Sequence, residues 1–285
     1  MPVSTIIAPM DLRAQTLEWR LKSEKIGFVP TMGALHAGHV SLIEAAKKKA
    51  DRVVVSIFVN PLQFGPKEDF GSYPRMLAAD IEKLDAAGVD ALFAPIAADM
   101  YPEGFQTSLT NNAINNILDG RSRPGHFDGV LTVVSKLFNL VQPDFAFFGK
   151  KDYQQLAVIT NMVRDLAFPL EIIGCPTARD PDGLAMSSRN LRLTPEERTL
   201  APHIYKGLRL IADAHAAGEK DHAQLIDIFR AHLSQVKDFR LDYIEIRAQD
   251  RLMDFDKVVD RAAVALVAAH LGSVRLIDNL EFGAQ

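Results

Sequence analysis

Along the first 175 or so residues, apolar segments typical of strands alternate with segments whose apolar residues recur at helical spacing. The strand candidates are residues 26–29, 52–59, 91–94, 145–148 and 170–175, and helical patterns lie near 40–50, 75–87, 129–141 and 152–167. Alternation of this kind predicts a parallel sheet with helices on both faces. The segment 52–59 is rich in β-branched residues, as is typical of a strand buried on both sides.

The pattern changes after residues 179–183. Thr194, Pro195 and Glu197 form a helix-start signal, from which we expect one long helix to about residue 217 and a second helix from about 221 to 236. Strand patterns follow at 241–247, 261–269 and 273–279, with a turn at Gly272. The sequence therefore predicts a Rossmann-like α/β domain over residues 1–178 and a smaller C-terminal α+β lid domain over residues 179–285.

Two histidines follow the first of these strands, where the next helix begins. His36 and His39 are separated by Ala37 and Gly38, and the preceding residues 30–35 read Pro-Thr-Met-Gly-Ala-Leu. The first amide N–H groups of a helix lack intrahelical partners and carry partial positive charge, so they attract anions such as phosphate. Residues three apart share a helix face, and Gly38 leaves room for a flat ring near the backbone. The segment predicts a nucleotide triphosphate site.

Other interpretations of the same segment are weaker. No G-x-G-x-x-G follows the strand and no G-K-[ST] is present, so neither the dinucleotide fingerprint nor the Walker loop applies. Both histidines can also simply pack or cap the helix. Metal binding is open in principle, but no third ligand is evident nearby and Cys175 is the only cysteine.

Composition restricts the class of protein. A hydrophobic content of 48%, a charged content of 24% and a net charge of −4 are those of a globular protein, and they give no support to nucleic-acid binding. A single cysteine excludes an internal disulfide framework. We see neither a signal peptide nor an uncharged apolar run of the ~20 residues that span a bilayer. These features predict a cytoplasmic protein without a membrane partner.

Polar residues also follow the other strands, at the edge where parallel α/β sheets bind ligands. Asn60 and Gln63 offer neutral hydrogen bonds, and Lys151 offers a charge that suits phosphate. Further along lie a basic loop containing Arg123 and the segment Ser187-Ser188-Arg189, whose hydroxyls and guanidinium suit β- and γ-phosphates. Each segment alone also fits a solvated loop. Together they are typical of enzymes that attack the α-phosphate of ATP and release pyrophosphate.

Residues 30–39 resemble the H-x-G-H signature of nucleotidylyltransferases and class I aminoacyl-tRNA synthetases, and residues 186–189 resemble their second, K-M-S-K-S-like element. Within that superfamily the chain resembles the pantothenate synthetases (pantoate–β-alanine ligases). The segments that carry the resemblance, in order along residues 24–200, are 30–36, 58–64, 123–127, 151–155 and 183–190. Lys150 differs from the family's segment, in which some relatives carry Glu at this position.

The resemblance implies that (R)-pantoate and β-alanine are condensed with ATP and Mg²⁺ through an enzyme-bound pantoyl adenylate, with release of AMP and pyrophosphate. It implies a catalytic set of His36, His39, Lys151 and Arg189. The ATP contacts that it implies are Met32, Gly33, Ala34, Leu35, His36, Ala37, Gly38, His39, Gly149, Lys150, Lys151, Asp152, Ala178, Met186, Ser187, Ser188 and Arg189. Within this set, Gly149 and Asp152 would contact the ribose, and the backbone of Ala178 and Met186 would frame the adenine.

For the other substrates, the resemblance implies that Gln63 and Gln155 hold pantoate and that Phe58 packs on its dimethyl group. Asn60 belongs to the same segment as Gln63, and β-alanine is expected near Gln63, Arg123 and Tyr73. A water held by Asp80 would contact Mg²⁺, which otherwise bridges phosphate oxygens. The resemblance also implies a homodimer.

Two other functions remain open. A nucleotidylyltransferase with a phosphorylated acceptor needs a basic acceptor pocket, whereas Gln63 and Gln155 beside Phe58 suit a small branched hydroxy acid. A non-catalytic nucleotide sensor needs only the adenine pocket, and the presence of both histidines, Lys151 and Arg189 favours an enzyme. An aminoacyl-tRNA synthetase fits least, because the acidic chain has no evident tRNA-binding domain.

Overall fold

The computed structural model describes residues 2–66, 68, 70–71 and 73–283. The chain divides into two compact units. Unit 1 comprises Met1–Lys150 and Val158–Pro176, and unit 2 comprises Lys151–Ala157 and Thr177–Gln285. Residues 151–157 thus pack with the later part of the chain, although they lie within the first domain that the sequence predicts.

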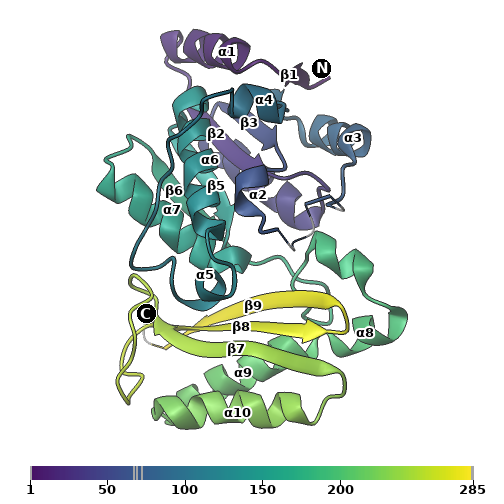
Figure 1. Ribbon diagram of the computed structural model, residues 1–285, viewed down its shortest axis with the longest axis vertical. Coiled ribbons are helices and arrows are strands. Elements are labelled where there is room, and N and C mark those ends of the chain that lie inside the picture. Colours follow the sequence, from purple (N-terminus) through teal and green to yellow (C-terminus); the bar gives the residue numbers. More distant parts are fainter. Residues whose placement is uncertain (1, 67, 69, 72, 284–285) are drawn as a thin grey trace. The chain divides into compact units, whose positions relative to one another are not determined.

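Unit 1 contains a six-stranded parallel sheet in the order β1-β4-β3-β2-β5-β6 (Figure 1). Its strands are β1 (Ser4–Ile6), β2 (Ile26–Thr31), β3 (Arg52–Ile57), β4 (Ala91–Phe93), β5 (Phe145–Gly149) and β6 (Glu171–Cys175). In the central pair, Ile26 is opposite Arg52 and Thr31 is opposite Ile57. This sheet confirms the predicted fold class of this part of the chain.

The strand order reverses direction beside β2. The chain moves from β2 outward to β3 and β4, and later returns to β5 on the other side of β2. Because parallel crossovers are right-handed, this reversal puts α2 (Ala37–Lys49) and α3 (Leu77–Ala87) on one face of the sheet. By the same rule α1 (Pro9–Leu21), α6 (His126–Val141) and α7 (Tyr153–Asp165) cover the other face. Ligands of such sheets bind outside the carboxyl ends of the strands at this reversal, where residues 32–39 lie.

Several elements were not predicted from the sequence, most of them short. They include β1, α1, α4 (Ala97–Met100), α5 (Leu118–Ser122) and the 3₁₀ turns η1 (Pro61–Gln63), η2 (Lys150–Asp152) and η3 (Ser188–Arg192). A strand or turn of three to five residues shows too few periods for a sequence pattern to be recognised. The 13-residue helix α1 begins at Pro9 and buries only Leu12, Thr16 and Trp19, so its apolar spacing is sparse.

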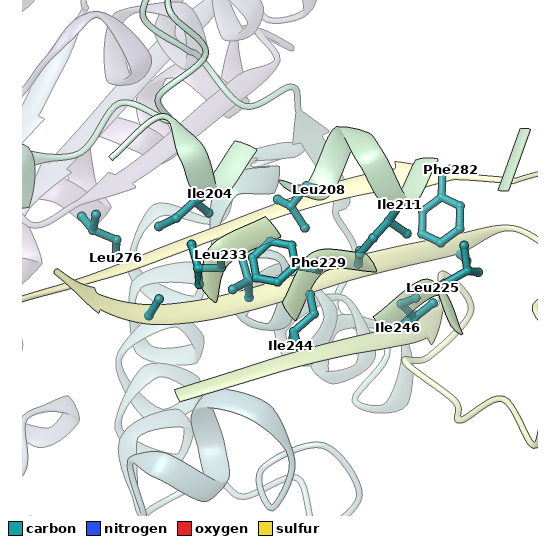
Figure 2. Packing of buried hydrophobic residues seen from close by; sticks show 14 of the residues in the cluster. Ile204, Leu208, Ile211, Leu225, Phe229, Leu233, Ile244, Ile246, Leu276 and Phe282 are labelled. Carbon is teal, nitrogen blue, oxygen red and sulfur yellow. The ribbon is translucent and has the colours of Figure 1, made fainter. Parts of the chain in front are cut away.

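Unit 2 consists of helices packed on an antiparallel sheet. Its helices are α8 (Pro195–Leu200), α9 (His203–Ala216) and α10 (His222–Ser234), and its strands β7 (Phe239–Ala248), β8 (Ala263–Leu271) and β9 (Val274–Phe282) pair in that order. Figure 2 shows the core, in which Ile204, Leu208 and Ile211 of α9 lie near Phe229 of α10 and Ile246 of β7. The predicted α+β composition of the C-terminal region is confirmed.

The prediction of a single long helix over residues 195–217 is wrong. The chain forms α8 and α9, which are separated by Ala201 and Pro202. Pro202 has no N–H to continue the hydrogen-bond ladder, and it becomes the N-cap of α9. The predicted start of α8 is confirmed, since Thr194 and Glu197 form a reciprocal capping box.

Helices in the described part of the chain are all too short or too polar to cross a membrane.

Candidate functional site

The histidine turn, residues 32–39, is held in shape by side chains from α3. Both Gly33 and Ala34 have positive φ angles, 85° and 51°. The Asp80 carboxylate accepts the backbone N–H of Ala34 and of Leu35, each at 2.8 Å, and the Lys83 ammonium donates to the carbonyl of Leu35. These bonds compensate a left-handed backbone that a non-glycine residue seldom adopts.

Asp80, the residue predicted to contact Mg²⁺ through a water, has a structural role in this turn. Its side chain is fully buried, and each carboxylate oxygen already accepts a backbone N–H. In the structure Asp80 positions the histidine turn, and its water-mediated contact with Mg²⁺ stays a prediction. No group of three or more His, Cys, Asp or Glu side chains suited to a metal ion occurs among the described residues.

His36 and His39 cap helix α2 in a reciprocal arrangement. The backbone N–H of Gly38 donates to Nδ1 of His36 at 3.1 Å, and the backbone N–H of His36 donates to Nδ1 of His39 at 3.3 Å. The two ring centroids are 4.1 Å apart. The capping interpretation of these histidines is therefore right.

The capping bonds determine which ring nitrogen carries the proton. A backbone N–H can only donate, so Nδ1 of each histidine must be an unprotonated acceptor. The proton of each neutral imidazole then lies on Nε2. Two Nε2–H donors thus lie on one turn at the N-terminus of α2, where the helix dipole already favours an anion.

A second group in unit 1 surrounds the side-chain amide of Gln63. Asn60 is buried and donates from Nδ2 to Oε1 of Gln63 at 3.0 Å, while Nε2 of Gln63 lies 3.2 Å from the sulfur of Met32. The ring of Phe58, also buried, is 6.2 Å from the ring of Tyr101. The structure thus brings together four of the predicted site residues, Met32, Phe58, Asn60 and Gln63, which we call the amide cluster.

Helix α6 supports the amide cluster from behind. A Cβ atom at Gly129 would lie 2.4 Å from the backbone of Leu62, so only glycine allows α6 to approach η1 this closely. His126, the first residue of α6, has its Nδ1 2.8 Å from the backbone carbonyl of Gln63. Its Nε2 lies 3.0 Å from the Arg123 guanidinium, which only donates, so Nε2 accepts and Nδ1–H donates to Gln63.

Arg123 and Tyr73, the weaker predicted β-alanine contacts, are occupied by protein groups. The Arg123 guanidinium binds both carboxylate oxygens of Glu68, at 2.6 and 2.7 Å, and Tyr73 packs edge-on against Phe64. Burial, followed by the Arg123 cation, lowers the pKa of His126 to about 4. The pKa of Glu68 is also lowered: burial raises it, but the hydrogen bond and charge of Arg123 outweigh that effect.

The predicted ATP residues that lie outside the histidine turn belong to unit 2, with two exceptions. Gly149 and Lys150 lie at the end of the segment Met1–Lys150, which belongs to unit 1. The Lys151 ammonium lies 3.8 Å from the Asp152 carboxylate, and the Lys151 carbonyl accepts from Nδ2 of Asn279 at 2.8 Å. Gln155 follows in the first turns of α7 and is half-buried. Nearby, the Tyr153 hydroxyl donates to Glu281, so two residues of β9 hold the segment 151–157.

The segment 178–189 forms a short hairpin that continues into η3. The backbone N–H of Met186 donates to the carbonyl of Ala178 at 2.9 Å, and Ser187 caps η3 by accepting the N–H of Arg189 at 3.2 Å. Ser188 is the first residue of η3. The predicted residues Ala178, Met186, Ser187, Ser188 and Arg189 are thus local neighbours.

A buried ion pair fixes this hairpin to β9. The Arg179 guanidinium binds both oxygens of Asp278, at 2.7 and 2.9 Å, and stacks on the ring of Tyr205 at 3.8 Å. Burial raises the pKa of Asp278, and Arg179 acts in the opposite direction. Sequence reasoning missed this pair, although adjacent polar residues within the apolar strand pattern of β9 were a usable signal.

Comparisons with known proteins show the family to which the chain belongs. A family model described as Pantoate-beta-alanine ligase matches residues 4–281. The chain is 54% identical to a pantothenate synthetase from Ectopseudomonas mendocina over 280 residues, which is 98% of each chain. It is 53% identical to a pantothenate synthetase from Pseudomonas putida over 98% of this chain and 97% of that one.

Solved structures give the same result. A pantothenate synthetase from Thermus thermophilus matches with a TM-score of 0.91 and 46% identity, over 98% of this chain and 99% of that one. A pantoate-beta-alanine ligase from Francisella tularensis, complexed with beta-gamma ATP and beta-alanine, matches with a TM-score of 0.80 and 38% identity. That match covers 98% of this chain and 97% of the other.

Proposed function

The chain belongs to the pantoate–β-alanine ligase family, and on that premise we propose how its residues condense (R)-pantoate with β-alanine at the expense of ATP. The observation that carries the proposal is the proton position on His36 and His39. Two Nε2–H donors at a helix N-terminus suit phosphate oxygens and make no nucleophile. In the mechanism proposed for this family, the nucleophile is the carboxylate of the substrate, so the protein has to supply donors rather than a nucleophile.

In the first step, a pantoate carboxylate oxygen attacks the α-phosphorus of ATP, and the bond from that phosphorus to the pyrophosphate oxygen breaks. The products are pantoyl adenylate and pyrophosphate. His36 and His39 donate hydrogen bonds to phosphate oxygens on which charge accumulates, which lowers the barrier most when the donors are already oriented. The capping bonds at Nδ1 provide that orientation.

In the second step, the amine of β-alanine attacks the acyl carbon, the bond to AMP breaks and the amine loses a proton. Gln63 and Gln155 bind the pantoate oxygens, and Phe58 packs on its methyl groups, where one methylene changes selectivity by ~1–3 kcal/mol. We also propose that β-alanine binds near Gln63.

For unit 2, we propose that Lys151 neutralises phosphate charge and that Ser187, Ser188 and Arg189 bind the β- and γ-phosphates. Gly149 and Asp152 contact the ribose in this proposal. The hydrogen bond between the backbones of Ala178 and Met186 supports a rigid hairpin for the adenine. The carbonyl of Lys151, fixed by Asn279, supports a defined position for its side chain.

Mg²⁺ is proposed to arrive with ATP, coordinated by phosphate oxygens and water, where it would neutralise phosphate charge. The donors of the histidine turn are neutral N–H groups, so they fit a magnesium ion held by the nucleotide better than one held by a protein cage. A cytoplasmic location and a homodimer are also proposals, supported by the single cysteine and by the family.

Oxygen transfer tests the adenylate directly. Pantoate carrying ¹⁸O in its carboxylate is incubated with ATP, Mg²⁺ and β-alanine, and AMP is analysed by mass spectrometry. Attack of the carboxylate on the α-phosphorus places one labelled oxygen between the phosphorus and the acyl carbon, and cleavage of the acyl–oxygen bond by the amine leaves that oxygen on AMP. Unlabelled AMP, or label in inorganic phosphate together with ADP, would contradict the proposal. A reaction without β-alanine should release no labelled AMP, because the label stays in the adenylate until its acyl–oxygen bond breaks.

A further inference from the structure

Tyr101 contacts two residues of the amide cluster although it lies 41 positions from Asn60 in the sequence. It follows α4, and its hydroxyl is 2.7 Å from Oδ1 of Asn60. Its ring lies 6.2 Å from that of Phe58 and 5.0 Å from that of Phe105. One tyrosine thus contacts both the polar and the apolar part of the proposed pantoate subsite.

Two backbone groups determine how the amide of Asn60 is oriented. The carbonyl of Gly129 can only accept, and it lies 3.1 Å from Nδ2 of Asn60. The N–H of Leu62 can only donate, and it lies 3.3 Å from Oδ1. The hydroxyl of Tyr101, which also faces Oδ1, must therefore be the donor.

The orientation of Asn60 then fixes that of Gln63. Because Nδ2 of Asn60 donates to Oε1 of Gln63, the carbonyl end of the Gln63 amide is directed at Asn60. The NH₂ end is directed away from it, and its nearest partner is the weakly accepting sulfur of Met32. An NH₂ group at this position suits the carboxylate or hydroxyl oxygen of a hydroxy acid, whereas a reversed amide would repel a carboxylate.

We propose that Tyr101 is a positioning residue for the acid substrate, which acts through Asn60 to keep the NH₂ group of Gln63 directed at the oxygens of pantoate. The inference rests on the proposed function. Tyr101 itself contacts no reacting atom in this scheme. Its ring, packed near Phe58, also restricts the position of the surface proposed for the methyl groups.

The hydroxyl of Tyr101 stays protonated under ordinary conditions. Burial raises the pKa of this phenol above its usual value. The effect of Tyr101 on pantoate binding is therefore constant across the neutral pH range. If the KM for pantoate changes with pH in that range, the titration of another group causes the change.

Tyr101→Phe removes the hydroxyl and keeps the ring. One hydrogen bond contributes about 1 kcal/mol net, which corresponds to about a fivefold change in binding. We expect the KM for (R)-pantoate to rise about fivefold, and the KM for ATP to change less than twofold. Discrimination against the analogue that lacks the 2-hydroxyl group should fall by a similar factor.

A double-mutant cycle separates positioning from general support. If Tyr101 acts through Gln63, then Tyr101→Phe causes no further rise in the pantoate KM in a Gln63→Ala background. The matched control is Tyr243→Phe, a buried tyrosine of β7 in unit 2, for which both KM values should stay unchanged.

Three results would overturn the proposal. They are an unchanged pantoate KM in Tyr101→Phe, equal losses for ATP and pantoate, or the same fivefold effect in the Gln63→Ala background. Failure of the proposed function gives a different result, because the wild-type protein would then form no AMP from pantoate, and the role of Tyr101 would be overturned with it.

Discussion

The candidate residues of the two units are held in place by different forces. In unit 1, the histidine turn and the amide cluster are held by hydrogen bonds from side chains to backbone groups, from the neutral His36, His39 and Asn60 and from the charged Asp80 and Lys83. In unit 2, the corresponding segments are attached by the buried Arg179–Asp278 pair and by Asn279. Arg198 forms partly exposed ion pairs with Asp180 and Asp182, which also hold this hairpin in place.

This difference separates two tasks. A bond to a backbone N–H or carbonyl fixes which end of a neutral side chain donates, and so it determines what that side chain recognises. An ion pair fixes where a segment lies and leaves the chemistry to the side chains that the segment carries. Unit 1 should therefore respond to changes in hydrogen-bond polarity and shape, and unit 2 to loss of anchors and charge.

The largest effects are expected from one residue of each unit that is proposed to contact phosphate. His39→Ala and Lys151→Ala should each reduce adenylate formation by roughly 10²-fold or more, because each removes a donor or charge aimed at the transferring phosphates. Single-turnover pyrophosphate release measures this. His39→Asn is a control for unit 1, since its amide oxygen can replace Nδ1 as the capping acceptor without restoring the Nε2–H donor. A near-normal rate in an alanine variant would remove that residue from the catalytic set.

Steric disruption should affect unit 1 next. Gly129→Ala places a methyl group 2.4 Å from the backbone of Leu62, so η1 and the Gln63 amide must move. We expect about a tenfold rise in the pantoate KM and a loss of about 1–3 kcal/mol in the free energy of unfolding. Gly65→Ala is the control, because its added Cβ makes only ordinary contacts at 3.7 Å. An active Gly129→Ala enzyme with unchanged KM would contradict the account of the amide cluster.

Lowering the pH should destabilise the protein through His126. Its pKa is about 4 in the folded protein and about 6.5 when unfolded, so below pH 6.5 the unfolded chain binds more protons. The folded state then loses stability as the pH falls from 6.5 to about 4. Between pH 7 and 5 the loss from this group is about 2 kcal/mol.

Denaturant unfolding at pH 7 and pH 5 tests this contribution. His126→Asn, which keeps an N–H for the carbonyl of Gln63 but does not titrate, should show a smaller loss than the wild type. Equal losses in both proteins would assign the acid sensitivity to other groups.

The smallest effect is expected at the anchor in unit 2. Asn279→Ala removes the hydrogen bond to the Lys151 carbonyl, which contributes about 1 kcal/mol, so the KM for ATP should rise about fivefold. The KM for pantoate should stay within twofold. Steady-state kinetics with each substrate varied in turn measures both values, and an effect confined to pantoate would contradict the assignment of this anchor to the ATP side.

The long elements were predictable because their apolar periodicity repeats several times. Strand 52–59 and the helix near 129–141 appear as Arg52–Ile57 and His126–Val141. The break at Pro202 was missed because Leu200 and Ile204, on either side of it, are four residues apart, as in a continuous helix. The shared backbone turn that joins His36 and His39 was also predictable, since both residues are local to one motif.

Contacts between distant segments were not predictable from the sequence. Nothing near Asp80 in the sequence indicates that its carboxylate accepts the N–H groups of Ala34 and Leu35, so its structural role was missed. Tyr101 was missed for the same reason, because its partner Asn60 is brought near only by the fold. Proton positions on the histidines likewise follow from geometry, not from residue type.

The most direct test of the two-step ligase is pyrophosphate release from ATP and Mg²⁺ with (R)-pantoate, measured with and without β-alanine. The account predicts a burst of about one pyrophosphate per active site with pantoate alone, and steady turnover to pantothenate and AMP when β-alanine is added. Absence of the burst, with pyrophosphate released only when both substrates are present, would contradict a stable adenylate formed before β-alanine reacts. No release under either condition would contradict the assignment of pantoate as the substrate.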